Sequence, residues 1–402
     1  MSSTRGDERE IMTRYLDYSA TTPVDERVLE AMMPYFTQEF GNANSLYSLG
    51  RDAFRTLEAA RESIAKNIGA EKPSEVIFTS GGTESDNAAL VGVLNKIAPE
   101  GGAHIISSAY EHHAILEPLA WLEKHGYEVT LVKPHTDGHV YAEDIEAAMK
   151  PNTKLVTVMH ANNEIGAVND IKAIAEVAHK HGALMHTDAV QSIGKVPFNA
   201  AEMGIDLASF SSHKIYGPKG IGALYMKAGT RFDPIIKGGG QEKRRRSGTQ
   251  NVAGAVGFAR ALEIMMEEFD TENARLAALR DSAIEQVTAR LENTEASINS
   301  GDRLPNIAPL LIKGVEGESM LLQLDNLGFA VSTGSACSSG SLEPSHVLLS
   351  IGVPQEVAHG SLRISVGRHT TPQDIDDLVE ALVPIVERLR AMSPVYTRMF
   401  CS

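Results

Sequence analysis

The stretch 211–220 reads Ser-Ser-His-Lys-Ile-Tyr-Gly-Pro-Lys-Gly and follows a run of residues that we expect to form a strand. Its lysine, Lys214, lies at the end of that strand, next to His213 and the hydroxyl of Ser211. A desolvated lysine beside such donors has a lowered pKa and can form a Schiff base with an aldehyde cofactor. A lone lysine in a loop is more often a surface residue, so this interpretation depends on its neighbours.

An acidic residue, Asp188, follows the strand expected before this lysine, and Gln191 comes three residues later. A carboxylate there suits the pyridine nitrogen of pyridoxal 5′-phosphate (PLP), because it keeps the nitrogen protonated and lets the ring accept electrons from a carbanion. Gln191 can hydrogen-bond the phenolic oxygen of the same ring. The alternative interpretation of Asp188 is a helix N-cap, which is common after a strand.

A glycine-containing turn at residues 79–85, Thr-Ser-Gly-Gly-Thr-Glu-Ser, lies between an expected strand and an expected helix. Gly82 lets the backbone approach an anion, and the helix N-terminus supplies free N–H groups and a favourable dipole. Thr83 adds a hydroxyl, so a phosphate group fits this turn. A capping box on an ordinary helix explains the same residues, although the Gly-Lys-Ser/Thr ending of a nucleotide P-loop is absent.

A cysteine, Cys337, lies in the stretch 332–341, Ser-Thr-Gly-Ser-Ala-Cys-Ser-Ser-Gly-Ser. Small residues and glycines cannot pack a core, so we expect an exposed loop. A free cysteine there is unusual, since structural cysteines are normally buried, and its accessibility favours a reactive thiolate. The alternative is an incidental loop cysteine, which is how we interpret Cys401.

His112 lies in a Tyr-Glu-His-His run at residues 110–113, after another expected strand. Its imidazole can stack on a cofactor ring and move protons, although a single histidine is more often a surface or core residue. The run also raises the question of a metal site. No helical histidine pair with a third ligand accompanies it, so we expect no metal.

Short apolar runs rich in β-branched residues alternate with amphipathic stretches over the first two thirds of the chain. Residues 171–181, for example, have apolar side chains at helical spacing. This alternation predicts an α/β fold with a mostly parallel sheet covered by helices on both faces. The runs that we expect to form buried strands are 76–79, 104–107, 129–132, 155–159, 184–186, 206–210 and 222–226.

The pattern changes after about residue 254, where a long helical segment, 256–291, leads into a second unit. That unit has expected strands at 308–312 and 361–365 and a closing helix at 374–392. We therefore predict a large cofactor-binding domain of residues 20–258. The predicted smaller α+β domain comprises residues 1–19 and 259–402 and carries the Cys337 loop.

The overall composition excludes several classes of protein. The 402 residues carry a formal net charge of −15, which argues against direct nucleic-acid binding. Two cysteines are too few for a disulfide scaffold. No apolar run is long enough to cross a bilayer, and the polar N-terminal stretch has no signal-peptide core. We expect a cytoplasmic protein without membrane association.

Taken in order, these motifs resemble those of the group I cysteine desulfurases, a PLP fold-type I family related to the class V aminotransferases. The resemblance extends over nearly the whole chain, from residues 15–23 to residues 367–371, and includes 159–166 and 244–249. It implies a homodimer that converts L-cysteine to L-alanine and receives the sulfur as a persulfide on Cys337. The implied sulfur acceptors are an iron–sulfur scaffold protein and other sulfur pathways.

The resemblance also implies a role for each motif residue. The catalytic residues would be Lys214 as Schiff-base lysine, Cys337 as persulfide carrier and His112 as ring-stacking proton carrier. Asn163 and Arg363 would hold the substrate carboxylate, for which the planar fork of an arginine is suited. The cofactor would be bound by Gly82, Thr83, His112, Asp188, Gln191, Ser211, His213, Lys214 and, from the neighbouring subunit, Thr249.

One stretch departs from the family pattern, because residues 41–45 are Gly-Asn-Ala-Asn-Ser and Tyr47 stands where a histidine is expected. Three other functions share parts of the motif set. A selenocysteine lyase uses the same cofactor chemistry, and so does an aminotransferase of this fold. A non-catalytic scaffold for iron–sulfur assembly is the third alternative, against which the full set of cofactor and thiol residues argues.

Overall fold

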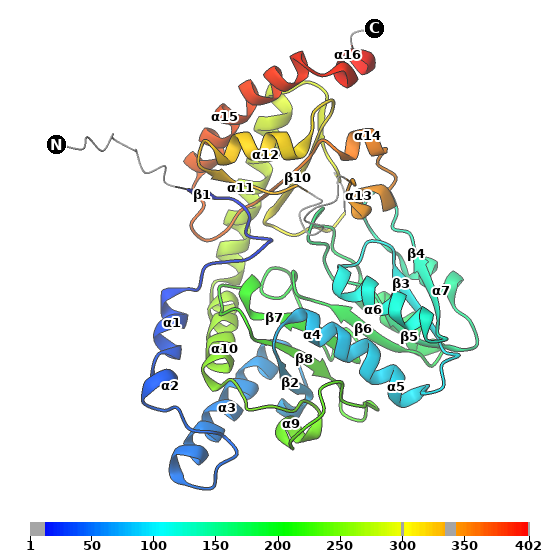
Figure 1. The fold of residues 1–402 in the computed structure, drawn as a ribbon, viewed down its shortest axis with the longest axis vertical. Coiled ribbons are helices and arrows are strands. Elements are labelled where there is room, and N and C mark those ends of the chain that lie inside the picture. The colour runs from blue at the N-terminus through cyan, green and yellow to red at the C-terminus, as the bar shows by residue number, and fades with distance from the viewer. Residues whose placement is uncertain (1–12, 299–300, 334–342, 401–402) are drawn as a thin grey trace, which may run out of the picture.

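The computed structural model describes residues 13–298, 301–333 and 343–400 (Figure 1). The predicted thiol, Cys337, lies outside these residues. The backbone forms one large sheet with helices around it, and a second, smaller group of strands and helices beside it (Figure 1). Within the described residues, no helix is both long and apolar enough to span a bilayer.

A seven-stranded sheet in the order β2-β8-β7-β6-β5-β3-β4 lies at the centre of the larger unit. Only β8 runs antiparallel to its neighbours, β2 and β7, so the predicted mostly parallel sheet is confirmed. The strands are β2 (Val76–Thr79), β3 (His104–Ser108), β4 (Glu128–Val132), β5 (Thr153–Thr157), β6 (Leu184–Asp188), β7 (Leu207–Ser211) and β8 (Gly222–Met226).

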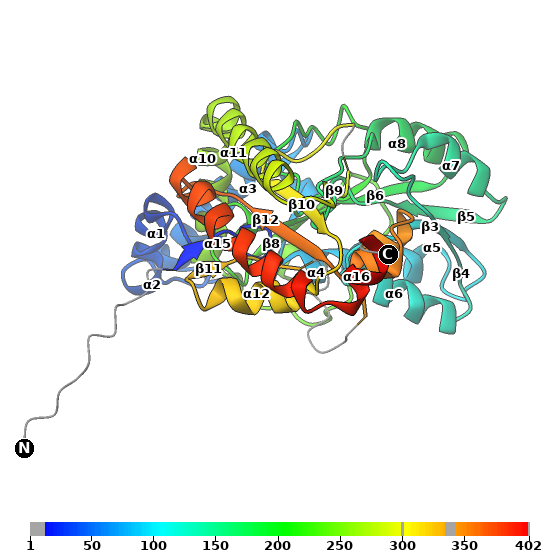
Figure 2. The same ribbon diagram turned by 90° about the horizontal axis from the view of Figure 1, so that it is seen from above.

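Helices cover both faces of this sheet, as predicted, because successive strand residues alternate between two cores (Figure 2). In β2, Val76 and Phe78 pack with the helices of one face, whereas Ile77 between them packs with those of the other. The first face carries α3 (Ser48–Asn67), α8 (Ile171–Lys180) and α10 (Val252–Glu267). The second carries α4 (Gly82–Asn87), the π-turn Ala88–Gly92, α5 (Val93–Ile97) and α6 (His113–Lys124).

The outer strand β4 differs from its prediction as a buried strand, since Leu131 is 47% exposed. A strand at the edge of a sheet is covered less completely than the central strands, and its apolar residues alone do not reveal that position. Four shorter helices complete the larger unit, namely α1 (Glu26–Met32), α2 (Pro34–Thr37), α7 (Ala142–Ala148) and α9 (Gln241–Arg244).

A separate apolar core holds the smaller unit together, and Leu16 from the N-terminal part of the chain is buried in it. Its sheet has the antiparallel order β12-β10-β9, and a second pair of strands, β1 and β11, is parallel. The strands are β1 (Arg14–Tyr15), β9 (Thr294–Ala296), β10 (Ile307–Ile312), β11 (Phe329–Ala330) and β12 (Ser361–Ser365). The helices are α11 (Phe269–Arg290), α12 (Gly317–Asp325), α15 (Pro372–Ala391) and α16 (Pro394–Phe400). Two short helices, α13 (His346–Ser350) and α14 (Gln355–Ala358), bury apolar residues in the core of the larger unit instead.

The helical segment predicted over 256–291 consists of two helices, because α10 ends at Glu267 and α11 begins at Phe269, with Glu268 between them. The Glu268 carboxylate pairs with Arg27 and with Arg368, which lie far from it in the sequence. Residues of α10 belong to the core of the large sheet and residues of α11 to the second core. The exact domain boundary at residue 258 stays a prediction.

Candidate active site

A cavity of about 320 Å³ opens at the carboxyl ends of the parallel strands, where α/β sheets usually bind ligands. The cavity brings together residues from both cores, including Arg363 of β12. Of the predicted site residues, those that line it are Gly82, Thr83, His112, Asn163, Asp188, Gln191, Ser211, His213, Lys214 and Arg363.

Lys214 is the last residue of the 3-10 turn Ser212–Lys214, directly after β7. Its Nζ donates to the backbone oxygens of Ser19 at 2.6 Å and Ala20 at 2.7 Å. The hydroxyl of Thr22, from the same N-terminal segment, donates to the His213 carbonyl at 2.9 Å. The segment at residues 19–22 therefore holds the lysine amine at the cavity wall.

Two buried carboxyl groups, Asp188 and Asp86, lie together in the cavity wall. Burial raises the pKa of Asp188 to about 6, although the Val190 backbone N–H donates to its Oδ1 at 2.9 Å. Burial and the neighbouring Asp188 also raise the pKa of Asp86. Asp188 is the last residue of β6 and is followed by a turn rather than a helix, so the N-cap alternative does not apply. A positively charged ring nitrogen would relieve this crowding of acids.

The glycine turn leads into α4, the π-turn and α5, which follow one another without a break. The N-cap residue, Gly81, makes no side-chain capping bond, so the first N–H groups of the helix stay available to an anion. Gly82 borders the cavity so closely that an added Cβ would lie 2.8 Å from Cγ2 of Val190. The turn therefore has the backbone approach expected of a phosphate site.

His112 is the N-cap of α6, and its Nδ1 accepts a hydrogen bond from the Ala114 backbone N–H at 3.1 Å. A backbone N–H can only donate, so the neutral ring carries its hydrogen on Nε2. Burial, with a contribution from the charge of Lys214, lowers the pKa of His112 to about 4. The imidazole is therefore neutral at physiological pH.

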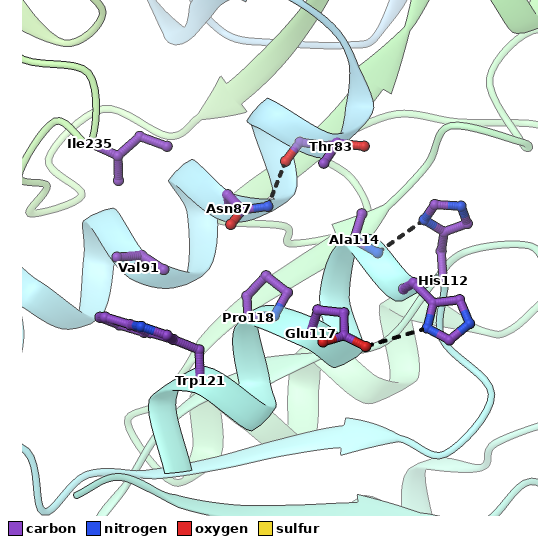
Figure 3. Close-up of a pocket in the computed structure, with 10 residues that line it drawn as sticks. Thr83, Asn87, Val91, His112, Ala114, Glu117, Pro118, Trp121 and Ile235 are labelled. Atoms are coloured by element: carbon purple, nitrogen blue, oxygen red, sulfur yellow. Dashed lines mark hydrogen bonds and ion pairs between the residues drawn. The ribbon is translucent and has the colours of Figure 1, made fainter. Parts of the chain in front are cut away.

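A second, wider hollow of about 650 Å³ adjoins the cavity, and Thr83, His112 and Ala114 line both. Figure 3 shows that its other walls come from the helices that follow Thr83 and His112, with Trp121 on one side and Ile235 on another. The cavity thus has an open side toward the surface of α4 and α6.

Arg363 reaches the cavity from the second core. Its Nη1 donates to the Asn163 carbonyl at 2.9 Å and its Nη2 to Oδ1 of Asp17 at 2.8 Å. Its Nε is buried and has no hydrogen-bond partner among the residues that the structure describes. The guanidinium group belongs to a residue that lines the cavity, and its planar set of donors suits a carboxylate ligand.

The segment that contains Cys337 lies between two described anchors. On one side, the backbone of Ser332 pairs with that of Arg363 through bonds of 3.2 and 2.8 Å. On the other, Ser345 donates to the buried carboxyl of Glu164, and His346 Nε2 lies 3.0 Å from the Glu111 carbonyl. Both anchors contact residues adjacent to those of the cavity.

Thr249 does not line the cavity and is exposed. It follows α9, in which Glu242, Lys243 and Arg244 have left-handed backbone angles. The buried Arg61 holds the Glu242 carboxylate through two hydrogen bonds of 2.6 and 2.9 Å. The structure of one subunit therefore leaves the predicted role of Thr249 untested.

Sequence reasoning missed several residues of this site. Asp86 follows Gly82 by four positions, so helical spacing could have placed both on one face. Asp17 and Ser19 lie in the stretch 15–23 that resembles the family, which by itself does not reveal that they contact Arg363 and Lys214. Lys195, which is buried behind Gln191, has no signal in the sequence that separates it from a surface lysine.

Comparison with known proteins supports the same family. The aminotransferase class-V model matches residues 14–378. The cysteine desulfurase IscS of Dictyoglomus turgidum is 48% identical over 94% of this chain and 96% of its own. The protein of the same name from Methanosarcina thermophila is 46% identical over 94% and 93%.

Among solved structures, a NifS-like protein superposes with a TM-score of 0.88 at 36% identity, covering 94% of this chain and 100% of its own. The range 14–378 that the family model matches includes all the residues that line the cavity. The chain belongs to the class-V aminotransferase family and, within it, groups with the cysteine desulfurases.

Proposed function

We propose that this enzyme is a PLP-dependent cysteine desulfurase, which converts L-cysteine to L-alanine and carries the sulfur as a persulfide on Cys337. The observation that carries the proposal is the meeting of Lys214, Asp188 and His112 with Arg363 in one cavity. The backbone of that arginine pairs with the start of the segment that contains Cys337.

The cavity residues fit PLP in three places. Lys214 offers an amine for the aldehyde, and the uncapped turn at Gly82 offers N–H groups for the phosphate. Asp188 and Asp86 offer buried carboxyl groups that lack a basic partner strong enough to keep their pKa low. The chemistry supplied by bound PLP is an electron sink for the Cα of the substrate.

The substrate carboxylate is the group that Arg363 and Asn163 would hold. The two Nη atoms of Arg363, which donate to the Asn163 carbonyl and to Asp17, would donate to the carboxylate when those hydrogen bonds are exchanged. Two donors in one plane fix the direction of the carboxylate. This orientation would present Cα to Lys214 and direct the side-chain sulfur away from the arginine.

Proton transfer at Cα would fall to Lys214, whose amine is already oriented by two carbonyl groups. The geometry of His112 modifies its predicted role as a carrier of the thiol proton. Since Nδ1 is occupied by a backbone N–H, the ring offers only an Nε2–H donor to the cavity. We therefore assign it a stacking contact and a hydrogen bond to developing negative charge.

Sulfur transfer balances without an external oxidant or reductant. The Cys337 thiolate forms an S–S bond with the substrate sulfur while the Cβ–S bond breaks. The electron pair of that bond stays with Cβ, which takes up a proton, so the products are alanine and a protein persulfide. An iron–sulfur scaffold protein or another thiol acceptor would then receive the terminal sulfur.

We also propose a homodimer in which Thr249 contributes to the phosphate site of the partner. Exposed apolar side chains concentrate on α1, α2 and the adjoining turn, where a second copy can cover them. They include Leu29, Met33, Phe36, Phe40, Leu46 and Tyr47, with Leu46 91% exposed. A cytoplasmic location completes the proposal, because free thiols stay reduced there.

The decisive experiment measures alanine and sulfide from L-cysteine and maps the persulfide mass shift onto the chain. Cys337→Ser should abolish sulfide release and keep PLP absorbance, whereas the matched control Cys401→Ser should retain full activity. Retained activity in the Cys337 variant overturns its assignment. Turnover of L-selenocysteine by that variant, without turnover of L-cysteine, would instead support a selenocysteine lyase.

A further inference from the structure

Lys195 is a buried amine that the proposed reaction does not use. It lies in the turn between β6 and β7, and its side chain is 6% exposed. Its Nζ donates to two oxygens of Gln191, the backbone carbonyl at 3.1 Å and Oε1 at 3.3 Å. Within the described part of the chain, no carboxylate forms an ion pair with it.

Burying an amine without a carboxylate costs free energy, because the charged form loses its hydration. Burial, together with the charge of Lys214, lowers the pKa of Lys195 to about 7. The titratable groups that share its surroundings are Lys214 and His213. A methionine would pack the same space without this cost, so the amine calls for an explanation other than packing.

The contact between Lys195 and Gln191 explains the buried amine, because it fixes the orientation of the Gln191 amide in the cavity wall. A protonated lysine amine only donates and a carbonyl only accepts. Oε1 of Gln191 must therefore face Lys195, and Nε2 must face the Ser19 carbonyl, to which it donates at 2.9 Å. The second hydrogen of Nε2 remains for a ligand of the cavity.

The same carbonyl of Ser19 accepts the Lys214 amine at 2.6 Å. A continuous chain of hydrogen bonds thus runs from Lys195 through Gln191 and Ser19 to the amine that would hold the cofactor. A charge at one end of a buried chain changes the potential at the other, since the protein interior screens it weakly.

We propose that Lys195 is a positioning residue that fixes the amide of Gln191 and places a positive charge behind the ring oxygen of bound PLP. The inference rests on the proposed function. It gives Lys195 no contact with substrate or cofactor, only an influence through Gln191. The negative charges of the ring oxygen and phosphate favour the charged form of Lys195 when the cofactor is bound.

The test is a pH titration of the visible absorption band of the PLP-loaded enzyme. A positive charge near the ring oxygen favours the deprotonated form of the bound cofactor. Lys195→Met removes that charge and should therefore raise the titration midpoint of the band by about one pH unit. Lys195→Gln keeps a hydrogen-bond donor but removes the charge, so it should raise the midpoint by a smaller amount. The proton concentration at the midpoint should still fall by at least twofold. Lys219→Met, at an exposed position of the lysine turn, is the matched control and should leave it unchanged.

A double-mutant cycle tests the route through the amide. In a Gln191→Ala background, Lys195→Met should cause a clearly smaller shift than in the parent. The use of two Lys195 variants guards against the case in which one of them fails to fold. If the midpoint is unchanged in both, the inference about Lys195 is overturned and the proposed function still stands. If the parent enzyme forms no visible band with PLP, both the proposed function and the inference about Lys195 fail.

Discussion

The cavity combines unlike charges at the level of single residues. Asp188 and Asp86 are buried in its wall near Glu111, whose pKa burial raises to about 8. The same cavity offers the amine of Lys214 and the helix N–H groups after Gly81. Such a site favours a ligand that is cationic at one end and anionic at the other, as a protonated pyridine with a phosphate is.

Among the residues described in the structure, Lys214 is the one lysine that lines the cavity, where Ser19 and Ala20 orient its amine. Lys214→Ala should therefore lose the visible band of the PLP-loaded protein and lower alanine formation by about 10³-fold. Absorbance spectra after addition of PLP and an alanine assay measure the two effects. An unchanged band in this variant would assign the cofactor to another lysine.

Glu164 gives a prediction about stability, because burial raises its pKa from 4.5 to about 7. The folded state thus binds this proton more tightly than the unfolded state, and its contribution to stability is lost as the pH rises from about 4.5 through 7. Glu164→Gln keeps an acceptor for Ser345 and removes the ionisation. At pH 8 the variant should gain up to about 3 kcal/mol in free energy of unfolding.

Urea unfolding of the parent and of Glu164→Gln, from pH 4.5 to pH 8 without PLP, measures this difference. The two proteins should be equally stable at the acid end and diverge above it. Parallel stability curves would show that the carboxyl group ionises at its ordinary pKa in the folded protein.

At the scale of elements, apolar runs predicted all seven strands of the large sheet to within a few residues, because central strands are recognisable by composition. Three features could not be read from the sequence. The reversal of β8 depends on its neighbours, the exposure of β4 depends on its edge position, and the break at Glu268 depends on distant arginines. All three are fixed by tertiary contacts.

The site was predictable where a motif gives several chemical groups in a row, as around Lys214 and Gly82. It was not predictable where a single side chain approaches from elsewhere, as Lys195 and Asp86 do. The position of Cys337 relative to the cavity lies outside the described residues and stays a prediction.

The buried pair between Arg61 of α3 and Glu242 of α9 supports the strained segment before Thr249. Removing one partner leaves an uncompensated charge, so Arg61→Met should cost about 3–5 kcal/mol in free energy of unfolding. Arg55→Ala is the matched control on the same helix, because its pair with Asp52 is exposed and should contribute less than about 1 kcal/mol. Equal losses in chemical denaturation would contradict the importance of the buried pair.

At the scale of the whole molecule, the apolar surface of α1, α2 and the adjoining turn predicts the oligomeric state. Phe36→Asp combined with Phe40→Asp should shift the protein from dimer to monomer, since both rings are more than half exposed in one subunit. Light scattering after gel filtration measures the mass. PLP retention on dilution should fall in the same variant, because the partner's phosphate contact would be lost.

Leu322→Asp changes an equally exposed residue of α12, on the smaller unit, and should leave both mass and PLP retention unchanged. If the variant with both Phe36→Asp and Phe40→Asp stays dimeric, the dimer interface lies on another surface.

The pairing of Ser332 with Arg363 has a consequence for motion. One residue of β12, Arg363, lines the cavity and pairs its backbone with Ser332, which precedes the stretch that contains Cys337. A small rotation of one core against the other would therefore move Arg363 and Ser332 together relative to Lys214. The spacing between the two would be preserved, and only their common distance to the lysine would change.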